Sequence, residues 1–170
     1  KQLGGATLLT GKAATKAALL AKGGACDVLH IATHGYADPE SPEFSALLLA
    51  GTADRPFETL TAQEVYLWPL NARLVTLSAC QTGLGKDVEG EGLMGLTRAF
   101  ICAGARDVLC SLWPVSDDST AKLMTRFYAS RTQASAVEQA LQEAQQALIA
   151  DPATKHPFFW AGFIAVRGPQ

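Results

Sequence analysis

The chain of 170 residues has little that would place it in a membrane or on a nucleic acid. No apolar run approaches the roughly 18 residues of a transmembrane helix, and no charged-then-apolar signal pattern opens the sequence. Lysine and arginine total 14 against 16 aspartate and glutamate, and the basic residues are scattered. Nucleic-acid binding, which needs clustered positive charge, is therefore not expected, and neither is a membrane partner.

Cysteine is sparse, and its placement excludes several kinds of site. The four cysteines, Cys26, Cys80, Cys102 and Cys110, are far apart and form no C-x-x-C pair. A disulfide framework is not indicated, so a reducing, cytoplasmic location is expected. Cys26, Cys102 and Cys110 stand among alanine, leucine and valine, which predicts that they are small buried hydrophobes. No metal or other cofactor is expected.

The sequence lacks internal repeats, low-complexity stretches and an initiator methionine. With 48% hydrophobic and 18% charged residues, it can bury one core and is short for two. We therefore expect residues 1–170 to form a single domain that belongs to a longer chain.

Apolar runs alternate with helical patterns, which indicates an α/β sandwich around a mostly parallel sheet. The runs of strand length are 28–32, 46–50, 74–77, 108–113 and 158–166. Helical periodicity covers 12–22, 93–103, 121–128 and 137–148, and capping boxes are predicted at Thr61 with Glu64 and at Ser135 with Glu138. Runs that are apolar on both faces are typical of strands covered by helices on each side.

Two of these strands end in side chains that can react together. The first run leads into His34 and Gly35, and the run at 74–77 leads into Cys80. In open α/β sheets the functional crevice lies beyond the carboxyl ends of the strands, where both residues would meet. An imidazole can raise the thiolate fraction of a nearby thiol and later protonate a leaving group. The pair therefore predicts nucleophilic catalysis by cysteine.

Five segments in this order resemble the CHAT domain, a family of the caspase-like superfamily that also contains separases. They are Ala32-Thr33-His34-Gly35, Ser78-Ala79-Cys80-Gln81-Thr82-Gly83, Glu91-Gly92-Leu93, Ser111-Leu112-Trp113-Pro114-Val115 and Phe159-Trp160-Ala161-Gly162-Phe163. The spacing from histidine to cysteine is close to the roughly 50 residues of the caspases. The resemblance implies a caspase-like three-layer α/β/α sandwich.

The resemblance also implies an activity and its residues. It assigns catalysis to His34 and Cys80, and an oxyanion hole to the backbone N–H groups of Gly35 and Cys80. The expected function is that of a cysteine endopeptidase that cleaves a specific protein substrate through a Cys-His dyad. Members of the family commonly carry tetratricopeptide repeats ahead of this domain, so a regulatory N-terminal segment of the parent chain is the second expected partner.

Two further residues are candidates for substrate binding. Ser78, two residues before Cys80, occupies a position that lines the S1 pocket in caspases, while it replaces the glutamine of the caspase string. Asp117 stands where separases, in a similar Trp-x-Val-x-Asp segment, recognise a basic residue of the substrate. An acidic residue that simply caps a helix is the alternative for Asp117.

The remaining histidines have structural interpretations. His30 precedes His34 by four residues, but the segment is predicted as a strand and lacks the glutamate of a zinc H-E-x-x-H site, so His30 is expected in the core with a hydrogen-bond partner. His156, before Pro157, is expected in a loop.

Two other functions remain open from the residues alone. A catalytically silent scaffold could bind a peptide in the same groove, because relatives of peptidases can lose activity and keep the fold. A Cys-His amidohydrolase usually sets its nucleophile in a G-x-C-x-G elbow, and the residues around Cys80 lack the first glycine.

Overall fold

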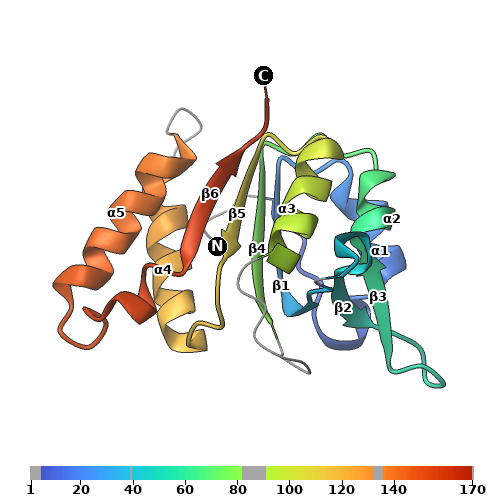
Figure 1. Cartoon of the computed structure of the whole chain (residues 1–170), viewed down its shortest axis with the longest axis horizontal. Helices are drawn as coiled ribbons and strands as arrows, with labels where there is room; N and C mark the ends of the chain where they lie inside the picture. Colours follow the sequence, from blue (N-terminus) through green and yellow to red (C-terminus); the bar gives the residue numbers. More distant parts are fainter. Residues whose placement is uncertain (1–4, 39, 82–90, 132–135, 170) are drawn as a thin grey trace.

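A computed structural model describes residues 5–38, 40–81, 91–131 and 136–169, without the side chains of 79–81 and 91–93. Three layers are visible in Figure 1: a central sheet with α1, α2 and α3 on one face and α4 and α5 on the other. The α/β sandwich predicted from the sequence is confirmed. The helices are α1 Lys16–Gly23, α2 Ala62–Tyr66, α3 Glu91–Cys102, α4 Asp117–Ser130 and α5 Val137–Ala150, with short 3-10 turns η1 Gly11–Ala13, η2 Pro42–Phe44 and η3 Pro157–Phe159.

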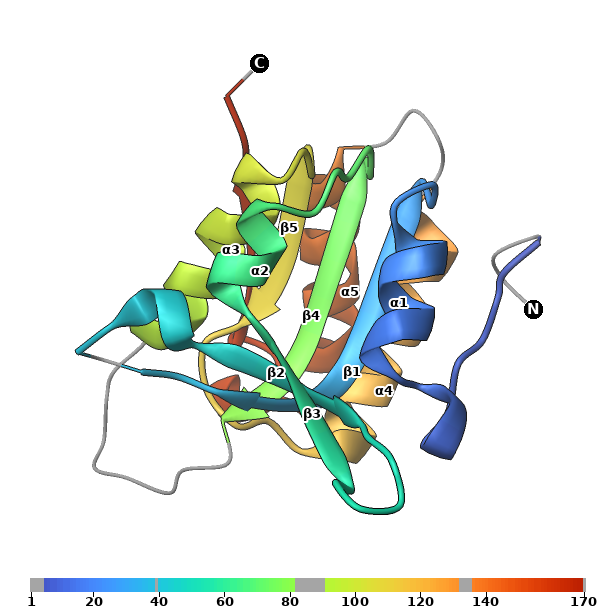
Figure 2. The same ribbon diagram turned by 90° about the vertical axis from the view of Figure 1, so that its right-hand side faces the viewer.

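Six strands form one mixed sheet in the order β3-β2-β1-β4-β5-β6. They are β1 Val28–Tyr36, β2 Ala46–Ala50, β3 Phe57–Thr61, β4 Leu74–Gln81, β5 Asp107–Ser111 and β6 Phe163–Arg167. The three central strands β1, β4 and β5 run parallel, whereas β2, β3 and β6 join antiparallel to their inner neighbours. Figure 2 shows β1, β4 and β5 side by side, with β2 and β3 crossing below them.

The structure tests several local predictions, of which one is confirmed. The capping box of α2 is present, because the Thr61 hydroxyl accepts from the Glu64 N–H and Glu64 reaches back to Thr61. Ser135, predicted to form a second capping box with Glu138, lies outside the described residues, and the N-cap of α5 is Ala136 without a side-chain hydrogen bond. No signal predicted β3, because only Leu60 of this edge strand is buried and the strand includes charged and polar side chains.

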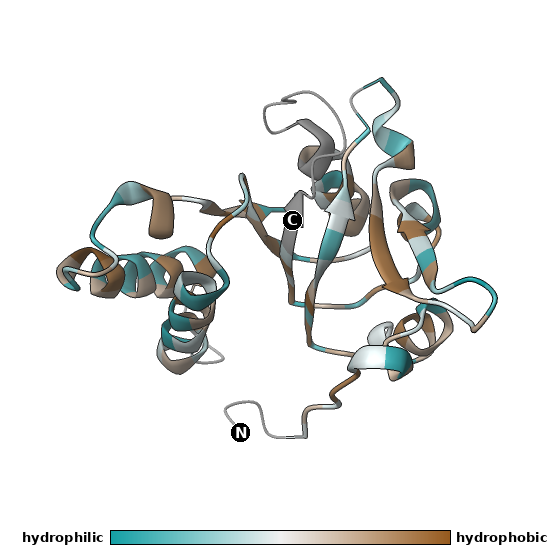
Figure 3. Cartoon of the chain, turned by 90° about the horizontal axis from the view of Figure 1, so that it is seen from below, coloured by the Kyte–Doolittle hydropathy of each residue, from teal (hydrophilic) through white to brown (hydrophobic). Residues whose placement is uncertain are grey.

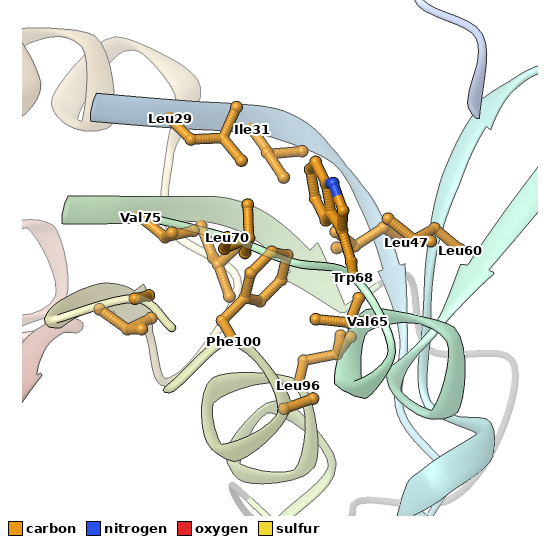
Figure 4. Close-up of a cluster of buried hydrophobic side chains, with 14 of the residues drawn as sticks. Leu29, Ile31, Leu47, Leu60, Val65, Trp68, Leu70, Val75, Leu96 and Phe100 are labelled. Carbon is orange, nitrogen blue, oxygen red and sulfur yellow. The ribbon is translucent and has the colours of Figure 1, made fainter. Parts of the chain in front are cut away.

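Two apolar cores hold the layers together. In Figure 3, hydrophobic (brown) and hydrophilic (teal) residues alternate along α4 and α5. This pattern is typical of amphipathic helices that pack one face on a sheet. Phe100 of α3 lies in the core under α1–α3, where Trp68 and Val75 also lie (Figure 4). Each large apolar side chain buried in this way contributes about 1.5–3 kcal/mol. Within the described ranges, no helix is long and apolar enough to cross a bilayer.

Candidate active site

Neighbouring parallel strands carry the predicted catalytic pair. β1 and β4 pair in register from Val28 opposite Leu74 to Gly35 opposite Gln81, and this register sets His34 directly opposite Cys80. Hydrogen-bonded strands lie about 4.8 Å apart, so the two backbones are adjacent at the carboxyl end of the sheet. His34 is exposed, and the side chain of Cys80 lies outside the described part of the chain.

Gly35, the candidate oxyanion donor, is fixed by strands on both sides. It is buried and lies opposite Leu47 of β2 and Gln81 of β4. The peptide that follows His34 is therefore held by two ladders, which fixes the backbone position of the histidine.

The loop after β1 is anchored rather than free. Oδ1 of Asp38 accepts hydrogen bonds from the N–H groups of Glu40 and Ser41 at 3.1 and 2.9 Å, and the loop continues into η2. A Cβ at Gly95 of α3 would lie 2.9 Å from the carbonyl oxygen of Pro42, so the absence of a side chain lets α3 contact η2 closely. Sequence reasoning missed this role of Gly95. The segment 82–90, which follows β4, lies outside the described residues.

A chain of hydrogen bonds joins β1, β4 and α4 on the face of the sheet that α4 covers. Nε2 of His30 lies 3.2 Å from Oγ of Ser78, and Nδ1 lies 3.1 Å from the Tyr128 hydroxyl. The same hydroxyl lies 2.9 Å from Oγ1 of Thr76. Sequence reasoning placed Tyr128 on the inner face of a helix but missed its polar role, although a tyrosine on a buried face usually finds a partner for its hydroxyl.

The prediction for His30 was right about hydrogen bonding and wrong about the core. The residue is exposed, because it borders the open space beside β1. Neighbouring atoms still remove water from part of the ring, and this desolvation lowers the pKa of His30 below its ordinary value.

We expect His30 to make the folded protein less stable in mild acid. A lowered pKa in the folded state means that the unfolded chain binds the proton first as the pH falls below about 6.5. The free energy of unfolding should then decrease by up to about 1.4 kcal/mol per pH unit until the folded state also protonates. Urea unfolding between pH 7.5 and 5 would measure this, and His30→Gln should remove that part of the slope. His156→Gln is the matched control, and an identical slope in both variants would contradict the assignment.

A pocket of about 260 Å³ brings together the two substrate-binding candidates. Asp117, the first residue of α4, and Ser78 of β4 both line it. The other lining residues are His30, Ala32, Ser111, Val115, Thr120, Ala121, Met124 and Phe163. Ser78 and Asp117, which are 39 positions apart in the sequence, thus share one small pocket beside β1 and β4.

Polar groups in this pocket have spare hydrogen-bonding capacity. The Thr120 hydroxyl is buried and has no hydrogen-bond partner among the described residues, while Asp117 is exposed. On one wall, a Cβ at Gly162 would lie 2.7 Å from Val115 and 3.1 Å from Trp113, so the segment at 159–163 packs tightly against this wall. The pocket is therefore suited to a side chain with an apolar stem and a polar or positively charged end.

The other cysteines differ from expectation in two of three cases. Cys110 is buried, and burial raises the pKa of its thiol. Cys26 is half-buried and donates to the carbonyl of Lys22 at 3.2 Å, whereas Cys102 is exposed at the end of α3. Apolar neighbours in sequence did not determine burial here, because helix ends leave side chains in solvent. Within the described ranges, no group of histidine, cysteine and acidic residues is arranged to hold a metal ion.

Comparison with known proteins adds a family and two relatives. The family model of the CHAT domain matches residues 1–168. Tetratricopeptide repeat protein 28 from Mus musculus is 37% identical over 107 residues, and the protein of the same name from Homo sapiens is 38% identical over 107 residues. Each match covers 63% of this chain and 4% of the relative.

Proposed function

Because this chain belongs to the CHAT domain family, a family with a caspase-like fold, we propose that it is a cysteine endopeptidase in which Cys80 and His34 form the catalytic dyad. The register that sets His34 opposite Cys80 on adjacent parallel strands carries the proposal. A reacting pair must come within hydrogen-bond reach, and neighbouring in-register positions at a strand end provide this with little rearrangement.

In the proposed reaction, His34 takes the proton of the Cys80 thiol and the thiolate attacks the scissile carbonyl carbon. The carbonyl oxygen becomes an oxyanion, for which the N–H groups of Gly35 and Cys80 are the proposed donors. The C–N bond then breaks and the proton on His34 passes to the leaving amine, which leaves a thioester on Cys80. Water, deprotonated by His34, attacks the thioester, and cleavage of the C–S bond releases the acid and regenerates the thiol.

The pocket of Ser78 and Asp117 is the proposed S1 site. A lysine or arginine at P1 would place its methylene groups against Met124 and Ala32 and its charge near the carboxylate of Asp117. The unpartnered hydroxyl of Thr120 supplies a further acceptor for the charged end. Ser78 is small and already engaged by His30, so it leaves room for a long side chain.

The proposed partners are a protein substrate and a regulatory segment of the parent chain. The matched region is 4% of the length of the mouse and human tetratricopeptide repeat proteins, so a domain of this kind occurs within much longer chains. We propose that tetratricopeptide repeats in the parent chain control access to the dyad.

A peptide acyloxymethyl ketone with arginine at P1 tests the proposal directly. The reagent should label Cys80 covalently in the parent chain, identified by mass spectrometry of the modified peptide, and His34→Ala should slow labelling at least about a hundredfold. Labelling should leave the exposed thiol of Cys102 unmodified, which serves as the internal control. Absence of labelling at Cys80 under conditions that activate the parent chain would favour the silent scaffold.

A further inference from the structure

The central strand β1 has one edge that the sheet leaves open. It pairs with β4 from Val28 to Gly35, but on its other side its ladder with β2 covers only Gly35 and Tyr36. Next to this short ladder, the Thr33 hydroxyl donates to the Leu48 carbonyl of β2. Outside the sheet ladders, no backbone hydrogen bond within the described ranges involves residues 28–33. Alternate residues of a strand direct their N–H and C=O groups to the same side, so about half of the groups in 28–33 face this opening.

Two grooves follow this open edge, one of about 1040 Å³ and one of about 870 Å³. Leu29, His30 and Ala32 border both grooves, and the segment 7–10 borders both from the opposite side. Figure 2 shows this N-terminal segment running beside β1 and α1 without joining the sheet. The first groove is at the upper end of the volumes that ligand pockets occupy, so it is large for a small molecule.

One face of β1 also lacks the cover that parallel strands require. Leu29 and Ile31, which face α1–α3, are buried. The alternate residues His30, Ala32 and His34, on the face of α4 and α5, are exposed. Parallel strands occur almost only in sheets covered on both faces, so an exposed face and an open edge on the same strand indicate an absent neighbour.

A half-buried arginine on this side has unused hydrogen-bonding capacity among the described residues. Nε of Arg131, at the end of α4, is buried without a hydrogen-bond partner among the described residues, and Arg131 borders the smaller groove. The neighbouring Arg73 is engaged with Asp27 at 2.7 Å. The carboxylates of Asp27 and Asp107 act on the charge of Arg131, but each is ion-paired with another arginine. A further carboxylate delivered into this groove would therefore be stabilised by Arg131.

We propose that the open edge of β1 is the docking site for an extended segment of the parent chain that precedes Lys1. The segment adds a strand along the open edge of β1 and places an acidic side chain at Arg131. We place this segment on the N-terminal side because residues 5–10 border the groove. The C-terminus instead follows β6, at the other side of the sheet (Figure 1). The mouse and human relatives extend far beyond the matched region, so chain of the required length exists in such proteins.

The docking does not depend on the proposed chemistry, and its test is read without activity. Hydrogen exchange is compared between the parent chain and the 170-residue chain, both carrying Cys80→Ser. Alternate amides in 28–33 should exchange at least about tenfold more slowly in the parent chain, because they gain strand partners. Equal exchange of these amides in the two proteins would overturn the proposal.

Thiol alkylation provides the second readout in the same two proteins. Cys26 borders the smaller groove and should become less reactive in the parent chain, while Cys102 at the end of α3 should not change. Arg131→Met in the parent chain should restore fast exchange in 28–33, whereas Arg126→Met, exposed on the same helix, should not. Protection that instead rises with the concentration of the 170-residue chain would assign the edge to a second copy and overturn the parent segment as the occupant.

Discussion

Replacing Cys80 by alanine is expected to abolish proteolysis and to leave the fold intact. The sulfur is the only protein atom in the proposed mechanism that bonds to substrate carbon, so its loss removes the thioester pathway entirely. His34→Ala should be nearly as inactive, because the two residues act as a unit and their losses do not add. The measurement is cleavage of a protein substrate by the activated parent chain, at least about a thousandfold below the unmodified protein.

Matched variants separate loss of chemistry from loss of structure. Cys102→Ala and His156→Ala remove an exposed thiol and an exposed imidazole elsewhere in the fold, and both should retain full activity. The His34, Cys102 and His156 variants should unfold cooperatively with a free energy within about 1 kcal/mol of the starting protein, because these three side chains are exposed. We expect the same of Cys80→Ala. Cleavage retained by Cys80→Ala would disprove the dyad.

The second expected result concerns specificity: Asp117→Ala should reduce cleavage after arginine or lysine far more than cleavage after leucine or methionine. The carboxylate is exposed in the free protein and loses water only when a side chain fills the pocket, so its pairing is weaker than that of a fully buried ion pair. We expect the ratio of basic to apolar cleavage to fall by between about tenfold and a hundredfold. The ratio is measured with matched peptide libraries on the activated parent chain.

Asp118→Ala is the control for this experiment. Asp117 and Asp118 both lie in the first turn of α4, where either carboxylate stabilises the helix dipole by about 0.3–1 kcal/mol. Only Asp117 lines the pocket of Ser78. Both variants should therefore lose similar stability, and only Asp117→Ala should change the cleavage ratio. Equal ratios in the two variants would leave Asp117 a helix-stabilising residue and end the S1 proposal.

The sequence determined the sheet that carries the site. The apolar runs at 28–32 and 74–77 predicted the two parallel strands, and the polar residues that follow predicted which strand ends are functional. This succeeded because buried parallel strands must be apolar on both faces, a pattern that local sequence records. The alternating order of strands and helices likewise left only one class of architecture. The predicted strand ended at residue 32, whereas β1 continues to Tyr36 and pairs with β4 as far as Gly35. Residues 33–36 were not predicted because they do not continue the apolar run.

Only the tertiary structure decided what surrounds the proposed dyad. Ser78 and Asp117 share a pocket because β4 and the start of α4 meet in space, and no periodicity in the chain encodes that distance. The bonds of His30 to Ser78 and Tyr128 likewise link three elements. The open edge of β1 was also invisible in the sequence, where 28–32 reads as a fully covered strand. Periodicity reports which faces a strand is built to bury, whereas the fold shows which of those faces and edges this part of the chain covers.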